Sequence, residues 1–264
     1  MKLLIVYAGA EWSDAAVDDL SRAGLPAEAE ALIACIKNSN VDHAASRLAE
    51  MFPRWNVTTV GCHQAAKASL LETARTWGPD LTVVDGGTRM EPAQLFGRAL
   101  HTYLLHHSQA SVRVGRKSPN PPGDPPRLIV AVGGAAPSEA AVRAIAARHW
   151  PPGTLVHIVT AVNAMLAQSG ISGELSYAHH RQVLTDAMHQ SADLLQKAGL
   201  GVTTEFRDAV PAELILSQAE HFHADCVFLG SRDPGFLART LLGSVASAVF
   251  SQAHCSVEVV RRKS

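Results

Sequence analysis

The stretch Ala224-Asp-Cys-Val-Phe-Leu-Gly-Ser-Arg232 decides the fold of this chain. Its residues 226–229 form a short apolar run that ends at Gly230, a pattern that predicts a strand buried on both faces of a sheet. A helix opened by Pro211 precedes this strand, and another helix begins at Ser244. A buried strand between two helices is the repeating part of a parallel α/β sheet.

The same alternation of strand and helix extends through the whole second half. Strands are expected at 128–132, 154–161, 201–207, 226–229 and 257–260. Helices are expected near 138–149, with Ser138 as a possible cap, near 174–198, from 211 and from 244. Because parallel strands need right-handed crossovers that cover both faces, this order predicts a doubly wound parallel sheet.

A proline-rich stretch separates this half from the first. Residues 118–126 read Ser-Pro-Asn-Pro-Pro-Gly-Asp-Pro-Pro, and five prolines in nine positions rule out regular strand pairing. Similar apolar strands open the halves at 2–7 and 127–132, and similar strands close them at 111–116 and 256–261. This internal repeat predicts a domain over 1–118, a linker over 119–126 and a second domain over 127–264.

The first half gives the same order of elements with weaker boundaries. Strands are expected near 3–8, 30–36, 55–61, 81–85 and 111–115. Helices are expected near 13–23, 40–52, 63–77 and 92–108.

Composition indicates an ordinary globular protein. The 264 residues are 47% hydrophobic and 18% charged, with a net charge of -1, which argues against a disordered chain or a nucleic-acid partner. The four cysteines lie far apart without a C-x-x-C pair, so the sequence signals neither a zinc ribbon nor a disulfide framework. No segment approaches membrane-spanning length, and the apolar run at 3–7 is too short for a signal peptide. A cytoplasmic location is therefore expected.

Residues 205–216, 224–232 and 241–245 together resemble the universal stress protein family. The resemblance is strong over 127–261, whereas the first half is supported mainly by the repeat. It implies two tandem α/β domains of the flavodoxin-like, adenine nucleotide α-hydrolase-like type. Each would be a five-stranded parallel doubly wound sheet with strand order 3-2-1-4-5.

Nucleotide-binding members of this family carry the pattern G-x-x-G, nine residues, then G-[ST]. It falls here on Gly230, Asp233, Gly243 and Ser244, so three of four positions match. The resemblance implies ATP or AMP, with Mg²⁺, as a possible ligand. The implied cofactor-binding residues are Gly230, Ser231, Arg232, Asp233, Gly243, Ser244, Val245, Gly133 and Ile158.

The residue types of this pattern suit phosphate binding. A glycine allows a phosphate to approach the main chain closely, and a helix that starts at Ser244 presents free amides and its dipole. Arg232 can add a charge-assisted contact. The alternative is that Gly230 makes only a tight turn and that Ser244 is only an N-cap.

Two departures weigh against nucleotide binding. Asp233 replaces a glycine, and at about 4 Å its charge would repel a phosphate by roughly 4 kcal/mol. Gly133 stands where the family's first strand usually ends in an aspartate that meets the adenine and ribose region. Reversing Asp233→Gly should therefore strengthen any affinity for ATP.

The first half departs further from the family pattern. If Asp80 is aligned with Asp225, Asp85 stands opposite Gly230, whereas an alignment by glycines pairs Gly87 with Gly230. Both registers stay open at this point. A phosphate site built from Gly87, Thr88, Arg89 and Arg98 is the less favoured interpretation, and a blunted structural domain is the favoured one.

No catalytic motif or metal-ligand spacing is recognisable, and no catalytic or metal residue is predicted. The thirteen histidines lack suitable spacing, and the cysteines are expected to be buried free thiols. The favoured function is a stress-response regulator, with a non-nucleotide-binding interaction protein and a weak nucleotide hydrolase as alternatives. The last strands, 112–114 and 257–259, are expected to pair as an intramolecular pseudo-dimer, with protein partners and further homodimerisation possible.

Overall fold

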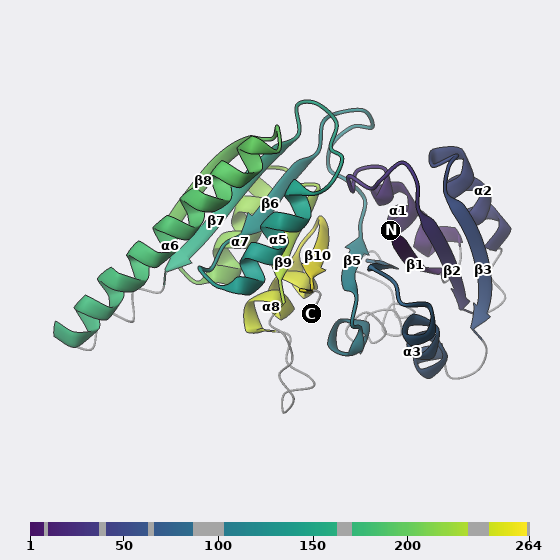
Figure 1. Cartoon of the computed structure of the whole chain (residues 1–264), viewed down its shortest axis with the longest axis horizontal. Coiled ribbons are helices and arrows are strands. Elements are labelled where there is room, and N and C mark those ends of the chain that lie inside the picture. The colour runs from purple at the N-terminus through teal and green to yellow at the C-terminus, as the bar shows by residue number, and fades with distance from the viewer. Residues whose placement is uncertain are drawn as a thin grey trace. The chain divides into compact units, whose positions relative to one another are not determined.

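A computed structural model describes residues 1–7, 10–36, 41–62, 66–86, 103–162, 171–231 and 243–262. Within these ranges the chain divides into two compact units, one over Met1–Ser118 and one from Pro119 onward (Figure 1). Each unit is an α/β sheet covered by helices. None of the helices in the described ranges is long and apolar enough to cross a membrane.

The first unit is a parallel sheet with strand order β3-β2-β1-β4-β5. Its elements are β1 (Lys2–Tyr7), α1 (Ala10–Leu20), β2 (Glu30–Ile36), α2 (Val41–Met51), β3 (Asn56–Cys62), α3 (Ala66–Trp77), β4 (Leu81–Asp85) and β5 (Ser111–Gly115). Residues 103–107 form a further helical turn before β5. The apolar side chains of α1 and α2 pack against β1 and β2 and form one core cluster.

The second unit is a parallel sheet with strand order β8-β7-β6-β9-β10. Its elements are β6 (Arg127–Ala131), α5 (Ala136–Ala146), β7 (Leu155–Val162), α6 (Ile171–Lys197), β8 (Gly201–Asp208), α7 (Pro211–His221), β9 (Cys226–Gly230), α8 (Ser244–Gln252) and β10 (Ser256–Val260). Counted within its own unit, the order is 3-2-1-4-5, and the first unit has the same order. The predicted fold class is confirmed in both halves.

Buried strands and amphipathic helices explain this arrangement. The central strands β6 and β9 are apolar at nearly every position, as expected for strands covered on both faces. Helices α5 and α6 pack on the sheet and contact each other, and α7 and α8 form a second pair of helices in contact. The core cluster of this unit lies between α5, α6 and the sheet.

An aspartate at the amino end of the fourth strand clamps the first strand in both units. In the first, the Lys2 amide donates to Asp80 Oδ2 at 2.8 Å, and the Asp80 amide donates to the Lys2 carbonyl at 2.8 Å. In the second, the Arg127 amide donates to Asp225 Oδ2 at 2.7 Å, and the Asp225 amide donates to the Arg127 carbonyl at 2.7 Å. Asp80 and Asp225 are therefore equivalent positions of the two repeats, and in this alignment Asp85 is equivalent to Gly230.

Helix starts differ slightly from the prediction. The first helix of the second unit begins at Ala136 rather than near 138, because Pro137 occupies its first turn. The predicted cap at Ser138 is wrong: this residue lies inside the helix, and its hydroxyl donates to the Ala135 carbonyl at 2.8 Å. Ala135 occupies the N-cap position without a side-chain hydrogen bond.

Candidate functional site

The carboxyl edge of the second sheet contains its topological switch point. Strand β6 has β7 on one side and β9 on the other, and the chain leaves β6 toward β7. Open parallel sheets bind ligands beyond the carboxyl ends of the strands at such a reversal of strand order. Gly133 follows β6 and Gly230 ends β9, so the structure brings these two predicted residues to neighbouring strand ends.

Gly230 has a packing reason to be glycine. A Cβ atom at this position would lie 1.9 Å from the Pro137 carbonyl oxygen and 2.7 Å from the Ser138 amide nitrogen. Real Cβ atoms do not approach main-chain atoms this closely, so the missing side chain lets the first turn of α5 rest on β9. Packing alone thus explains why position 230 is a glycine, and no ligand is needed to account for it.

Gly243, by contrast, has no packing reason to be glycine. It is the exposed N-cap of α8 with φ of -56° and ψ of 150°, and a Cβ atom there would meet nothing within 4 Å. The Ser247 amide donates to the Gly243 carbonyl at 3.0 Å, so helical hydrogen bonding within α8 leaves the preceding amides, including those of Ser244 and Val245, without intrahelical acceptors. These amides and the helix dipole suit an anion.

Gly133 also lies in open space. Its residue is exposed, and a Cβ atom there would meet nothing within 4 Å. The turn is instead made by Gly134, whose φ of 64° lies in the left-handed region that glycine adopts readily. The packing of this unit would therefore accept an aspartate at position 133.

The remaining predicted residues divide between the edge and the core. Ser231 is buried, and its amide donates to the Val260 carbonyl at 2.9 Å, which ties the start of the loop to β10. Ile158 is fully buried in the core cluster with Val130 and Phe228, so it lies beneath the strand ends rather than among them. Arg232 and Asp233 lie outside the described residues.

The corresponding edge of the first unit has different chemistry. Asp85 ends β4 at the place that Gly230 has in β9, and it puts a carboxylate where the pattern has glycine. Tyr7 ends β1 with its side chain buried, and its hydroxyl has no hydrogen-bond partner among the described residues. Burial is the main reason that the pKa of Tyr7 is raised, and the nearby carboxylate of Asp14 adds to it. The other predicted residues here, Gly87, Thr88, Arg89 and Arg98, lie outside the described ranges.

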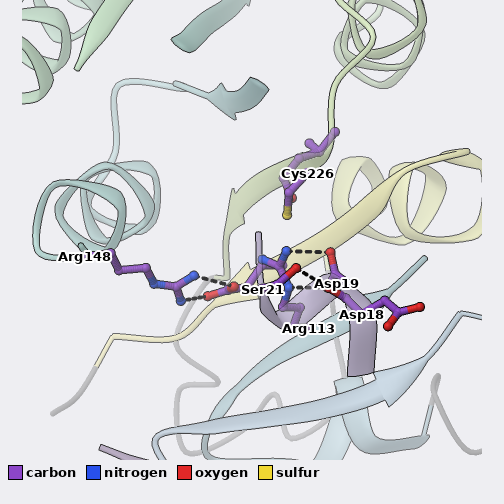
Figure 2. A network of polar contacts seen from close by, with 8 residues as sticks. Asp18, Asp19, Ser21, Arg113, Arg148 and Cys226 are labelled. Carbon is purple, nitrogen blue, oxygen red and sulfur yellow. Dashed lines mark hydrogen bonds and ion pairs between the residues drawn. The ribbon is translucent and has the colours of Figure 1, made fainter. Parts of the chain in front are cut away.

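Each unit contains a buried ion pair that the sequence pattern did not predict. Arg113 on β5 donates through Nε and Nη2 to the Asp19 carboxylate on α1, at 2.6 and 2.8 Å (Figure 2). In the second unit, Arg148 donates through both terminal nitrogens to Glu258 on β10. The available signal was a single charge inside an apolar strand, Ser-Val-Arg-Val at 111–114 and Ser-Val-Glu-Val at 256–259.

The described residues contain no group of three or more His, Cys, Asp and Glu side chains that could hold a metal ion. Cys35, Cys226 and Cys255 are buried and none of the three is in a disulfide, as the sequence predicted for these positions.

Comparisons with known proteins agree on one family. The sequence model described as the universal stress protein family matches residues 126–261. A universal stress protein of Methanocaldococcus jannaschii is 36% identical over 77 residues, which cover 29% of this chain and 45% of that protein. The match thus spans less than half of that relative's length.

Two solved structures resemble nearly the whole chain. A universal stress protein from Archaeoglobus fulgidus has a TM-score of 0.63 and 15% identity, and the match covers 99% of this chain and 96% of the other. A putative universal stress protein from Pseudomonas aeruginosa has a TM-score of 0.65 and 16% identity, with coverages of 98% and 92%. At such identities these likenesses establish the fold.

Proposed function

Because the chain belongs to the universal stress protein family, we propose that it is a cytoplasmic stress-response regulator whose second unit binds an adenine nucleotide, ATP or AMP. The nucleotide would lie beyond the carboxyl ends of β6 and β9. The first unit would serve as a structural partner without a nucleotide of its own.

The observation that carries this proposal is the start of α8. Gly243 has neither a conformational nor a packing requirement for glycine, yet it directly precedes the unpaired amides of a helix. A residue without a side chain at that place leaves a phosphate free to reach those amides. Ser244 is exposed and its hydroxyl can add a hydrogen bond to the same phosphate.

The two departures from the family pattern weaken binding without abolishing it. Gly133 leaves the ribose hydroxyls without a carboxylate acceptor, and Asp233 adds a negative charge that Mg²⁺ would offset. We therefore expect weak affinity, and a larger gain from Mg²⁺ for ATP than for AMP, because ATP carries more phosphate charge.

A second candidate function is a pure interaction protein with both sites closed to nucleotide. Asp85 and the buried Tyr7 favour it for the first unit, since one adds a charge and the other adds bulk at the strand ends. The pairing of the two last strands stays a prediction of the same kind. Native mass spectrometry, which gives the mass of the assembly, tests whether chains associate further.

Nucleotide binding is tested by native mass spectrometry of freshly purified protein and by calorimetric titration with ATP and AMP, each with and without Mg²⁺. We expect Gly243→Val to abolish the signal, because its side chain would cover the free amides of α8. Ser251→Ala, at the exposed other end of α8, is the matched control and should bind normally. Absence of binding at millimolar nucleotide would eliminate the proposal and leave the interaction protein.

A further inference from the structure

A cavity of about 330 Å³ lies between α5 and α6 of the second unit, beside the turn that follows β6. Val132 and Val142 contribute buried apolar surface to it, and Ser191 contributes a buried hydroxyl. Charged side chains from both helices surround the apolar part. None of these residues belongs to the predicted nucleotide site, whose anion-binding amides are on α8.

The corresponding seam of the first unit, between α1 and α2, is bridged by ion pairs. There Arg47 of α2 reaches across to α1, where it pairs with Asp14 at 3.3 Å and also with Asp18. In the second unit, α5 presents Arg143 to the cavity, and no described carboxylate forms an ion pair with it. The second seam therefore has a cavity with a guanidinium on its lining that is available to a ligand.

The hydroxyl groups lining the cavity are arranged as acceptors. Ser138 donates its hydroxyl proton to the Ala135 carbonyl at 2.8 Å, and Ser191 donates its own to the Ala187 carbonyl at 2.7 Å. Each serine oxygen thus has only lone pairs left to offer, which suits an N–H donor.

Two carboxylates reinforce this preference for a cationic donor. Glu139 on α5 and Asp186 on α6 both line the cavity and are exposed. A phosphate-bearing ligand would be repelled by this pair, whereas an ammonium group would be attracted. Arg143, on the same cavity, would hold a carboxylate through paired N–H donors.

We propose that this cavity binds the zwitterion of an apolar α-amino acid. The carboxylate pairs with Arg143, the ammonium is held by Glu139, Asp186 and the serine oxygens, and the side chain packs on Val132 and Val142. The volume is near the lower limit of small-molecule sites, which fits a ligand of this size. The proposal does not depend on nucleotide binding.

The test uses the full chain and L-leucine as the probe, titrated by ligand-observed NMR and by calorimetry. We expect a Kd of about 1 mM or tighter. Isoamylamine has the same side chain without the carboxylate, and isocaproate has it without the ammonium, so both should bind at least about tenfold more weakly.

The key variant is Arg143→Gln, which removes the guanidinium from an exposed position and should keep the fold intact. We expect it to weaken leucine binding about tenfold or more and to leave isoamylamine unaffected. Arg75→Gln, the same change at an exposed position of α3, is the control, and circular dichroism confirms folding. Failure of leucine to bind, or equal binding to the wild type and Arg143→Gln, would overturn the proposal.

Discussion

The ion pair between Asp19 and Arg113 gives the sharpest prediction for stability. The Arg113 side chain is 0% exposed and that of Asp19 is 4% exposed, so neither charge is screened by water. Asp19→Asn keeps the shape of the side chain but removes the negative charge with which the buried guanidinium of Arg113 pairs. Breaking a buried pair in this way costs about 3–5 kcal/mol, a large part of the 5–15 kcal/mol that typically stabilises a domain.

The neighbouring residue supplies the control. Asp18 lies on the same helix and also pairs with an arginine, Arg47, but its side chain is 59% exposed. Asp18→Asn should therefore cost only about 0–1 kcal/mol.

Urea unfolding followed by tryptophan fluorescence measures both effects, because Trp55 and Trp77 lie in the first unit. Hydrogen exchange of peptides from β1, β4 and β5 reports the first unit separately. The double replacement Asp19→Leu with Arg113→Met removes both charges together and should recover much of the loss. A cost of Asp19→Asn no larger than that of Asp18→Asn would refute the reasoning.

Three further outcomes are expected. Gly230→Ala should destabilise the chain by about 1–3 kcal/mol because its methyl overlaps the Pro137 carbonyl, whereas Gly133→Ala should have little effect; thermal unfolding compares them. Gly133→Asp should strengthen ATP binding in calorimetry, since the open space at this position accepts the missing carboxylate. Burial disfavours the charged form of His157 and lowers its pKa from the usual value of 6.5. The unfolded chain therefore binds more protons than the folded chain below that pH, and the free energy of unfolding falls as the solution is acidified. His157→Gln should make this fall shallower, which is measured as the urea midpoint at several pH values.

Sequence periodicity predicted the elements well because each depends on a local pattern. Buried strands such as 226–230 were expected within two or three residues of their bounds, and the helix over 211–221 was expected to begin at Pro211, as it does. The sequence left two alignments of the halves open. The structure decides between them, because Asp80 and Asp225 make the same hydrogen bonds to the first strand of their own unit. Contacts of that kind join residues far apart in the chain and leave no periodic trace.

The candidate site was predictable in outline but not in the role of each residue. The glycines at 230 and 243 look alike in a motif, yet only the surroundings show that one is required by packing and the other is not. Ile158 lies in the core because its position along β7 places it below the strand ends. The cavity lies at the seam between α5 and α6, and among the described residues an ion pair bridges the equivalent seam only in the first repeat, a difference that no local pattern reveals.

The aspartate clamp at the amino edge of each sheet separates the demands of folding from those of binding. Both copies keep the same reciprocal bonds at that edge, while the opposite edge carries Asp85 in one copy and Gly230 in the other. A duplicated domain of this kind can lose or change a ligand at the carboxyl edge of one sheet and still keep the aspartate hydrogen bonds that align its central strands. Engineers who graft new specificity onto this scaffold should accordingly vary the loops after β6 and β9 and leave Asp225 untouched.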